Sequence, residues 1–315
     1  MLGFIGKRLL ATVLTLLAIS VLIFIAGSVL PGDAAQMQLN VFANDTNLAA
    51  LREQMGLNQP IWHRYLSWLF AAVRGDLGTS MSFQTPIAPL VIDRFEQSAI
   101  LTVAAMAVSV PLALILGLLS GLYRNRLPDY LMTGVGLLGI SVPEFVWGVL
   151  LIVIFSDRLG LLPPTSITDG SALQDPQVLV LPVLTLTLLT LAQVGRLMRS
   201  GVVSTLKEDF IRTARLKGAT PGRTVFRHIF PNSVSPAISA IGLNFGWMFG
   251  SLAVIETLFS YPGLGNLIVF SVQNRDIPLL QAAVLFVSLV VCLGNLAADL
   301  VILALDPRLR SRAGS

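Results

Sequence analysis

The chain has 315 residues, of which 12% are charged and 54% apolar, and its mean hydropathy is +0.78. Soluble domains carry roughly 25% charged residues, so the composition excludes an ordinary soluble domain and predicts a membrane protein. The net charge of +4 could indicate a nucleic-acid partner, but membrane topology explains the positions of the basic residues better, and we expect no nucleic-acid binding.

Six apolar runs are each long enough to cross about 30 Å of hydrocarbon as a helix. They are residues 9–32, 97–123, 130–156, 176–195, 229–255 and 277–298. The first run follows Lys7 and Arg8, as in a signal peptide, but it is longer than the 7–15-residue apolar region of such a peptide, so we expect an uncleaved anchor. The predicted fold is all-α, a polytopic membrane protein with six transmembrane helices.

The basic residues predict the orientation of these six spans. With both ends of the chain in the cytoplasm, 15 of the 21 Lys and Arg residues fall on the cytoplasmic side and 6 on the other. Such an excess is typical of cytoplasmic loops. We therefore expect a multi-pass membrane protein whose N- and C-termini are cytoplasmic and whose apolar spans contact lipid.

The segment 33–96 is the longest polar piece and is predicted to be external. Within it, residues 61–74 have the pattern of an amphipathic helix, with His63 on its polar side and Trp62 and Trp68 among the aromatic residues on the rest. Such a helix suits the membrane surface, but it could equally pack on the protein's own bundle. The sequence leaves these two alternatives open.

The segment 206–232 is the longest basic interruption between two apolar runs. Leu206, Phe210 and Ala214 recur at helical spacing and predict one helix with an apolar edge. Gly218 follows this helix and permits a backbone conformation that other residues resist.

A second helix is predicted after the glycine. Thr220 is a good N-cap residue and Pro221 suits the first helical position, while Pro231 is expected to end the helix. Two helices around a glycine on a membrane surface are suited to being held by another protein. The alternative is a solvated basic loop attracted to anionic lipid.

No catalytic set emerges from the sequence. His63 and His228 fall on opposite sides of the membrane in this topology, so they cannot share a metal ion. There is no GxxxxGK[ST] phosphate loop. We expect neither an enzyme nor a cofactor held by this chain; a passive channel or a non-transporting adaptor remains as an alternative of a different class.

The segment 206–232 resembles the "EAA loop" of ABC importer permeases, in which E-A-A, three residues, G, nine residues and I-x-L-P follow one another. Gly218 matches the glycine, whereas the E-A-A positions hold Arg-Thr-Ala. With the stretches 56–60, 75–80, 256–265 and 305–310, the chain resembles the peptide/nickel branch of these permeases. The resemblance implies an ATPase-coupling loop that includes Phe210, Arg212, Thr213, Ala214, Gly218, His228 and Pro231.

The resemblance also implies a type I ABC importer permease fold, a location in the bacterial inner membrane and the partners of such an importer. These are a homologous second permease subunit in a heterodimer, two cytoplasmic ABC ATPase subunits that bind ATP and Mg, and an external solute-binding protein. The implied cargo is short peptides, with nickel, another metal chelate or another small solute as the alternative. The expected organisation is an anchor helix at 1–32, an external segment at 33–96, a five-helix permease core at 97–305 that includes the coupling loop at 199–235, and a cytoplasmic tail at 306–315.

Candidates for the translocation pathway or its gate lie in the third run and in and after the fifth. They are Glu144, Asn244, Gly246, Glu256, Phe259, Pro262 and Gly263. Glu144 is costly at membrane depth unless it is paired or wet, so it either lines a water-filled path or is hydrogen-bonded or protonated. Glu256 either anchors the following turn, which by resemblance projects outward beside the path, or caps the helix end.

Two further features of the apolar runs concern a glycine face and an acidic residue. Gly246 is the centre of glycines at positions 242, 246 and 250, which share one helix face; that face packs within the chain or forms the seam with a second subunit. Asp299 is expected to be an interfacial charge that reaches toward water.

Overall fold

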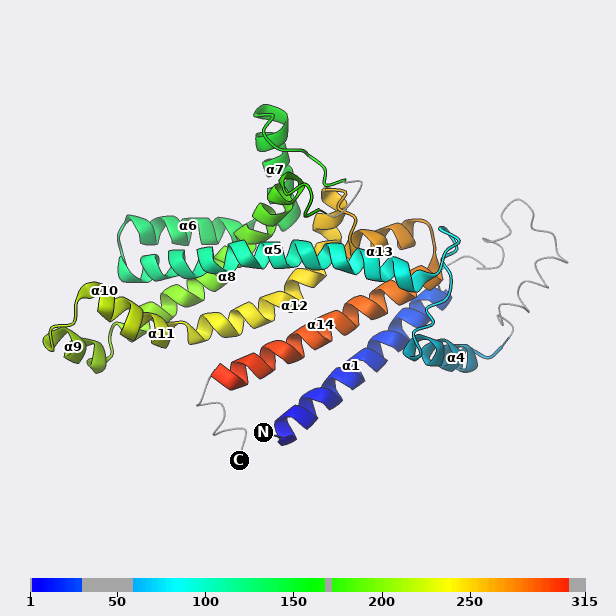
Figure 1. Ribbon diagram of the computed structural model, residues 1–315, viewed down its shortest axis with the longest axis horizontal. Helices are drawn as coiled ribbons and strands as arrows, with labels where there is room; N and C mark the ends of the chain where they lie inside the picture. Colours follow the sequence, from blue (N-terminus) through cyan, green and yellow to red (C-terminus); the bar gives the residue numbers. More distant parts are fainter. Residues whose placement is uncertain (1, 30–58, 168–171, 306–315) are drawn as a thin grey trace.

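The computed structural model describes residues 2–29, 59–167 and 172–305, which form helices and no β-strand (Figure 1). The first helices are α1 (Leu2–Val29), α4 (Ile61–Val73), α5 (Ile87–Leu122), α6 (Leu127–Ser141), α7 (Glu144–Leu151) and the π-helix η2 (Ile152–Arg158). They are followed by α8 (Gln177–Thr205), α9 (Asp209–Leu216), α10 (Pro221–Thr224), the π-helix η3 (Val225–Ile229), α11 (Phe230–Ser233), α12 (Ser235–Leu258), α13 (Leu264–Gln273) and α14 (Ile277–Leu305). The predicted all-α class is confirmed.

Among the described residues, α1, α5, α8, α12 and α14 are each long and apolar enough to cross a membrane. Helix α8 is central, since 72% of its most apolar window is buried, against 11% for α1. Gly117 and Gly121 let α5 approach α8 closely: a Cβ on Gly117 would lie 2.8 Å from Cβ of Met198. Small residues at these positions let two helices of the same chain come into direct contact.

The third predicted span is not one straight helix. Helices α6 and α7 meet at Val142 and Pro143, and the two arms of the pair are bent by 108°. Val142 is extended, with φ −109° and ψ 128°, because the residue before a proline is pushed out of the helical region. Figure 1 shows α7 leaving the direction of the other long helices. The prediction of one continuous helix over 130–156 was wrong, and the pair makes a sixth span only as a broken one.

Several helices also extend beyond the apolar runs. Helix α5 begins at Ile87, ten residues before its run, so the expected boundary at 96–97 lies inside a helix. Helix α8 continues to Thr205, well past its run. A run of apolar residues marks the length that suits lipid, whereas a helix continues into water wherever its backbone stays satisfied. The expected tail at 306–315 and the part of the expected external segment at 33–58 lie outside the described residues.

Helix α4 packs on α1 through one face only. The hydroxyls of Tyr65 and Ser20 lie 2.9 Å apart, and the rings of Tyr65 and Trp68 contact Phe24. The opposite face exposes Trp62 and Phe70, among other apolar side chains. Packing on the bundle therefore holds for one side of α4, and an apolar surface suited to the membrane interface remains on the other.

An ion pair joins the start of α1 to α14 near its end. Arg8 Nη1 lies 2.8 Å from Asp299 Oδ2, so Asp299, expected to be an interfacial charge, is paired within the chain. The pair places the beginning of α1 and the end of α14 at one end of the bundle, as six spans require. Figure 1 shows α9 and α10 beyond this end, and α4 and α13 at the other.

Candidate functional site

Two short helical pieces form the segment 209–233, hereafter the α9–α11 segment, and the expected turn lies between them. Gly218 has φ +82°, the left-handed conformation that glycine adopts without strain. Thr220 is the N-cap of α10, and its hydroxyl accepts the amide hydrogen of Arg223 at 3.4 Å. The predicted glycine joint and the predicted start of the second helix are both confirmed.

The apolar edge of α9 differs from the prediction. Helix α9 begins at Asp209, so Leu206 belongs to the turn after α8. The side chain that anchors α9 is Ile211, only 1% exposed, which packs in one buried cluster with Ile229 and residues of α8. The adjacent acids Glu208 and Asp209 could have indicated this start, because acidic residues favour a helix N-terminus.

Three large apolar side chains of this segment remain open to their surroundings. Phe210 is 42% exposed, Leu216 80% and Phe226 75%. The segment also has five exposed basic side chains: Arg212, Arg215, Lys217, Arg223 and Arg227. The segment therefore combines a buried anchor with exposed side chains that are apolar or cationic.

Pro231 does not end the second helix. The helical path continues through η3 and α11 to Ser233, with Pro231 in the first turn of α11, where its missing amide hydrogen costs little. The hydroxyl of Ser233 donates to Thr205 Oγ1 at 3.0 Å, which fixes α11 to the end of α8. His228 lies on the same path, half-buried, and its carbonyl accepts from the side chain of Asn232.

At the other end of the bundle, Glu256 anchors the turn that follows α12. Its carboxylate is fully buried and accepts from Ser98 Oγ at 2.5 Å and from the amide of Asn266 at 3.0 Å. A Cβ on Gly263 would collide with this carboxylate, so only glycine fits there. Of the two alternatives for Glu256, the structure places it as the anchor of the turn.

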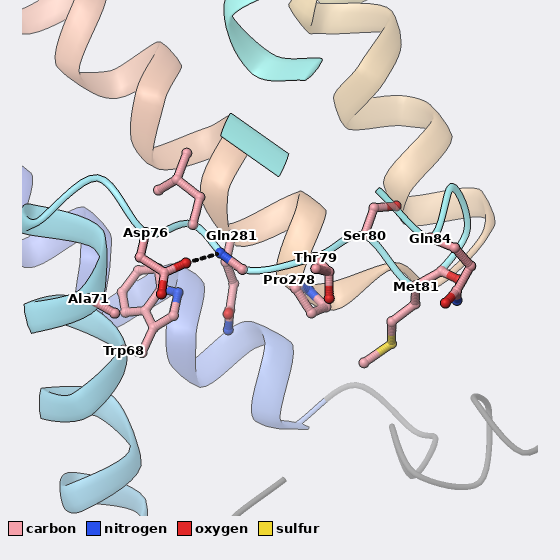
Figure 2. A pocket seen from close by; sticks show the side chains of 11 residues that line it. Trp68, Ala71, Asp76, Thr79, Ser80, Met81, Gln84, Pro278 and Gln281 are labelled. Atoms are coloured by element: carbon pink, nitrogen blue, oxygen red, sulfur yellow. Dashed lines mark hydrogen bonds between the residues drawn. The ribbon is translucent and has the colours of Figure 1, made fainter. Parts of the chain in front are cut away.

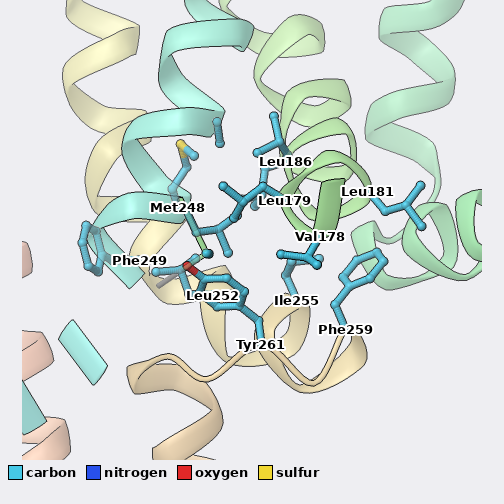
Figure 3. Close-up of a cluster of buried hydrophobic side chains, with 14 residues drawn as sticks. Val178, Leu179, Leu181, Leu186, Met248, Phe249, Leu252, Ile255, Phe259 and Tyr261 are labelled. Carbon is cyan, nitrogen blue, oxygen red and sulfur yellow. The ribbon is translucent and has the colours of Figure 1, made fainter. Parts of the chain in front are cut away.

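This turn is packed against the helices of the bundle. Phe259 and Tyr261 are fully buried in a cluster with side chains of α8 and α12 (Figure 3). Tyr261 donates its hydroxyl hydrogen to the Gln97 carbonyl at 2.7 Å, and burial, then the neighbouring Glu256, raises the pKa of Tyr261 above its usual value. The carbonyl of Pro262 accepts from Arg94 Nη1 at 3.2 Å. The turn is thus a packed connection to α13.

The remaining pathway candidates are not gathered at this turn. Glu144 stands in the first turn of α7, half-buried, and its Oε2 has no hydrogen-bond partner among the described residues. Asn244 is buried in α12. A Cβ on Gly246 would lie 2.6 Å from Oδ1 of Asn295, so this glycine faces α14 of the same chain.

One buried ion pair was not foreseen from the sequence. Asp129, 3% exposed, accepts from Arg199 Nε at 2.5 Å and Nη2 at 2.8 Å, and from Ser120 Oγ at 2.7 Å. These contacts join α6, α8 and α5 at the end of the bundle that carries the α9–α11 segment. The position of Asp129 directly after Pro128 is typical of a helix start, and it is the one local signal for this residue.

A pocket of about 310 Å³ lies at the opposite end, between α4, the connection to α5 and the start of α14 (Figure 2). Trp68 and Gln281 line it, and so does Asp76, which accepts the amide hydrogen of Gly78 at 3.0 Å. Ser80, also in the lining, donates to the buried Asp276 at 2.5 Å. The first bond is within the connection, and the second holds the connection against the start of α14.

Comparison with known proteins gives consistent matches over the chain. The family described as "Binding-protein-dependent transport system inner membrane component" matches residues 113–311, and the related N-terminal family matches residues 1–114. The chain is 38% identical over 310 residues to the "Glutathione transport system permease protein GsiC" of Escherichia coli O6:H1, covering 98% of this chain and 99% of that protein. The protein of the same name from Escherichia coli K12 is 37% identical over the same shares.

Proposed function

Since this chain belongs to the family of binding-protein-dependent transport system inner membrane components, as a non-catalytic permease subunit of an ABC importer, we propose that it forms half of a translocation pathway for short peptides. It is a multi-pass protein of the inner membrane. The main support for this mechanism is the α9–α11 segment, in which Ile211 is buried and Phe226 is 75% exposed.

The cargo proposal rests on the glutathione permeases that this chain resembles along almost its whole length. Glutathione is a tripeptide, so peptide-like solutes are the class that these relatives suggest. Nickel or another metal chelate is the alternative, because the sequence resembles the peptide/nickel branch of these permeases. Selection between them belongs largely to the external binding protein that delivers the solute.

In this proposal the α9–α11 segment is held by the cytoplasmic ATPase subunits. Phe210, Leu216 and Phe226 enter apolar hollows of an ATPase, and the exposed arginines of the segment meet acidic groups on its surface. ATP and Mg are bound by those two subunits and not by this chain. Orientation follows the charge distribution, with the N- and C-termini and the α9–α11 segment in the cytoplasm.

The contacts of the α9–α11 segment with α8 and α12 allow it to transmit movement to these helices. Ser233 of α11 bonds to Thr205 of α8, and a Cβ on Gly201 would collide with the Ser233 carbonyl, so the two helices are in direct contact. Helix α12 begins two residues after α11 ends. A displacement imposed on α9 by ATPase closure therefore reaches two membrane spans, α8 and α12.

The second permease subunit packs along α12 in this proposal. Leu243, Trp247 and Val254 are exposed along that helix, and Gly250 leaves open space beside them. Gly246, one turn before Gly250, packs on Asn295 of α14, so it contributes to the fold of this chain. Glu144, with its unpartnered oxygen, remains the candidate for the pathway, whereas Glu256 maintains the turn after α12.

Uptake in intact cells tests the cargo proposal. Cells that express the importer with its neighbouring subunits are given labelled glutathione, a labelled dipeptide or ⁶³Ni²⁺, and cells lacking only this chain are the control. Peptide uptake that depends on this chain is the expected result. Chain-dependent nickel uptake without peptide uptake would assign the cargo to the alternative.

A further inference from the structure

A basic cavity lies where α5 ends, α6 begins and α8 ends. Its volume is about 500 Å³. Three cationic side chains line it, two from the α5–α6 turn and one from the turn after α8: Arg124, Arg126 and Lys207. The other lining residues are Gly121, Leu122, Tyr123, Val203 and Leu206, so the lining contains no carboxylate.

The backbone that carries these cations is fixed by contacts next to the cavity. Asp129 accepts the amide hydrogen of Asn125 at 2.9 Å and thereby fixes the turn between the two arginines. Its charge is paired with Arg199, so it does not neutralise the cations of the cavity. A Cβ on Gly121, which lines the cavity, would lie 2.5 Å from Cβ of Val202, so α5 and α8 touch there. The three cationic side chains are exposed, so they are open to a ligand from the surroundings.

The depth of the cavity follows from the length of α5. Residues 97–122 of this helix carry no charge, and 26 residues span about 39 Å at 1.5 Å per residue. A bilayer measures about 30 Å across its hydrocarbon and about 40–45 Å with its headgroup regions. Arg124 and Arg126, directly after this stretch, therefore stand at headgroup depth.

Two exposed tyrosines mark the same depth. Tyr123 is 47% and Tyr130 66% exposed, on either side of the α5–α6 turn. Tyrosine is enriched where the membrane meets water, because its ring is apolar and its hydroxyl is polar. Leu122, Val203 and Leu206 give the cavity apolar walls beside its three cations, which a small soluble anion would not use.

We propose that this cavity binds the headgroup of an anionic phospholipid of the surrounding leaflet. Basic pockets between transmembrane helices bind the phosphates of such lipids. The apolar walls receive the first part of the acyl chains, and the three cations surround the phosphates. The site is separate from the α9–α11 surface and does not depend on the identity of the cargo.

Lipid binding by the purified full-length chain, with the subunits that co-purify, tests this proposal. Native mass spectrometry measures retention of cardiolipin from mixed micelles, with phosphatidylcholine as the uncharged reference. The variant R124Q/R126Q/K207Q is expected to bind cardiolipin on the order of 100-fold more weakly, from roughly fivefold for each cation removed. The charge-retaining variant R124K/R126K is expected to keep most of the binding.

A matched variant removes equal charge elsewhere at the same end. R212Q/R215Q/K217Q lies on the α9–α11 segment, outside the cavity, and is expected to retain cardiolipin. Equal loss in both triple variants would overturn the proposal in favour of a diffuse basic surface. Displacement of the lipid by glycerol 3-phosphate at a matched concentration would assign the site to a soluble phosphate. Loss of ATPase subunits from the cavity variant in lipid-free detergent would make the cavity a protein interface and would also overturn it.

Discussion

Replacing Phe226 with alanine tests whether another protein covers the α9–α11 segment. Full burial of a phenylalanine side chain is worth about 1.5–3 kcal/mol. Phe226 is 75% exposed in this chain, so an ATPase that covers it would gain about 1–2 kcal/mol from this side chain. The F226A variant should therefore bind the ATPase subunits about 5- to 30-fold more weakly, while its own unfolding temperature stays near that of the parent.

Two comparison variants make the result specific. Phe70 of α4 is 62% exposed at the opposite end of the bundle, so F70A should leave ATPase association unchanged. Ile211 is 1% exposed, so I211A should lower stability, by about 2–5 kcal/mol as for other large-to-small core changes. Association is measured by titrating ATPase subunits onto immobilised permease, and stability by thermal unfolding in detergent. Unchanged association for F226A, or equal loss for F70A, would refute the docking role of this surface.

Four further outcomes follow for individual residues. Gly246→Leu forces a side chain against α14 and should cost about 1–3 kcal/mol of stability; parental unfolding and complex yield would show that this face has room. Glu256→Ala leaves the buried donors of its turn unpaired and should lower stability by about 1–3 kcal/mol for each donor. Glu144→Gln should keep stability and lower peptide uptake. Parental stability for Glu256→Ala together with lost stability for Glu144→Gln would exchange the roles of the two residues. In a cysteine-free background, an impermeant thiol reagent should label Ser82→Cys and not Thr220→Cys in intact cells, and labelling of the latter would reverse the orientation.

Local chemistry predicted part of this molecule well. A threonine and a proline at 220–221 have few alternatives to starting a helix, and Gly218 takes the left-handed conformation because other residues would be strained there. Long apolar runs become helices because lipid leaves no other way to satisfy the backbone. These features need only neighbours in sequence.

Features that depend on distant residues could not be predicted in the same way. The bend at Pro143 was visible as a proline, but hydropathy does not record the direction of the chain, and the third run was therefore interpreted as one helix. Ile211 and Phe210 are adjacent and both apolar, and only the position of α9 against α8 decides that Ile211 is the buried one. Asp129 and Arg199 are 70 residues apart, so counting charges by loop could not pair them.

Transport by the reconstituted complex tests the central claim most directly. Tagged permease is purified with its co-purifying subunits, placed in proteoliposomes with the external binding protein, and assayed together for ATP hydrolysis and uptake of labelled tripeptide. Uptake should require ATP, and Gly218→Leu, strained at φ +82° by about 1–2 kcal/mol, should lower uptake per ATP hydrolysed while the subunits stay bound. Uptake that continues without ATP, or an unchanged ratio in the Gly218→Leu variant, would contradict the claim that this chain is an ATP-driven permease coupled through its α9–α11 segment.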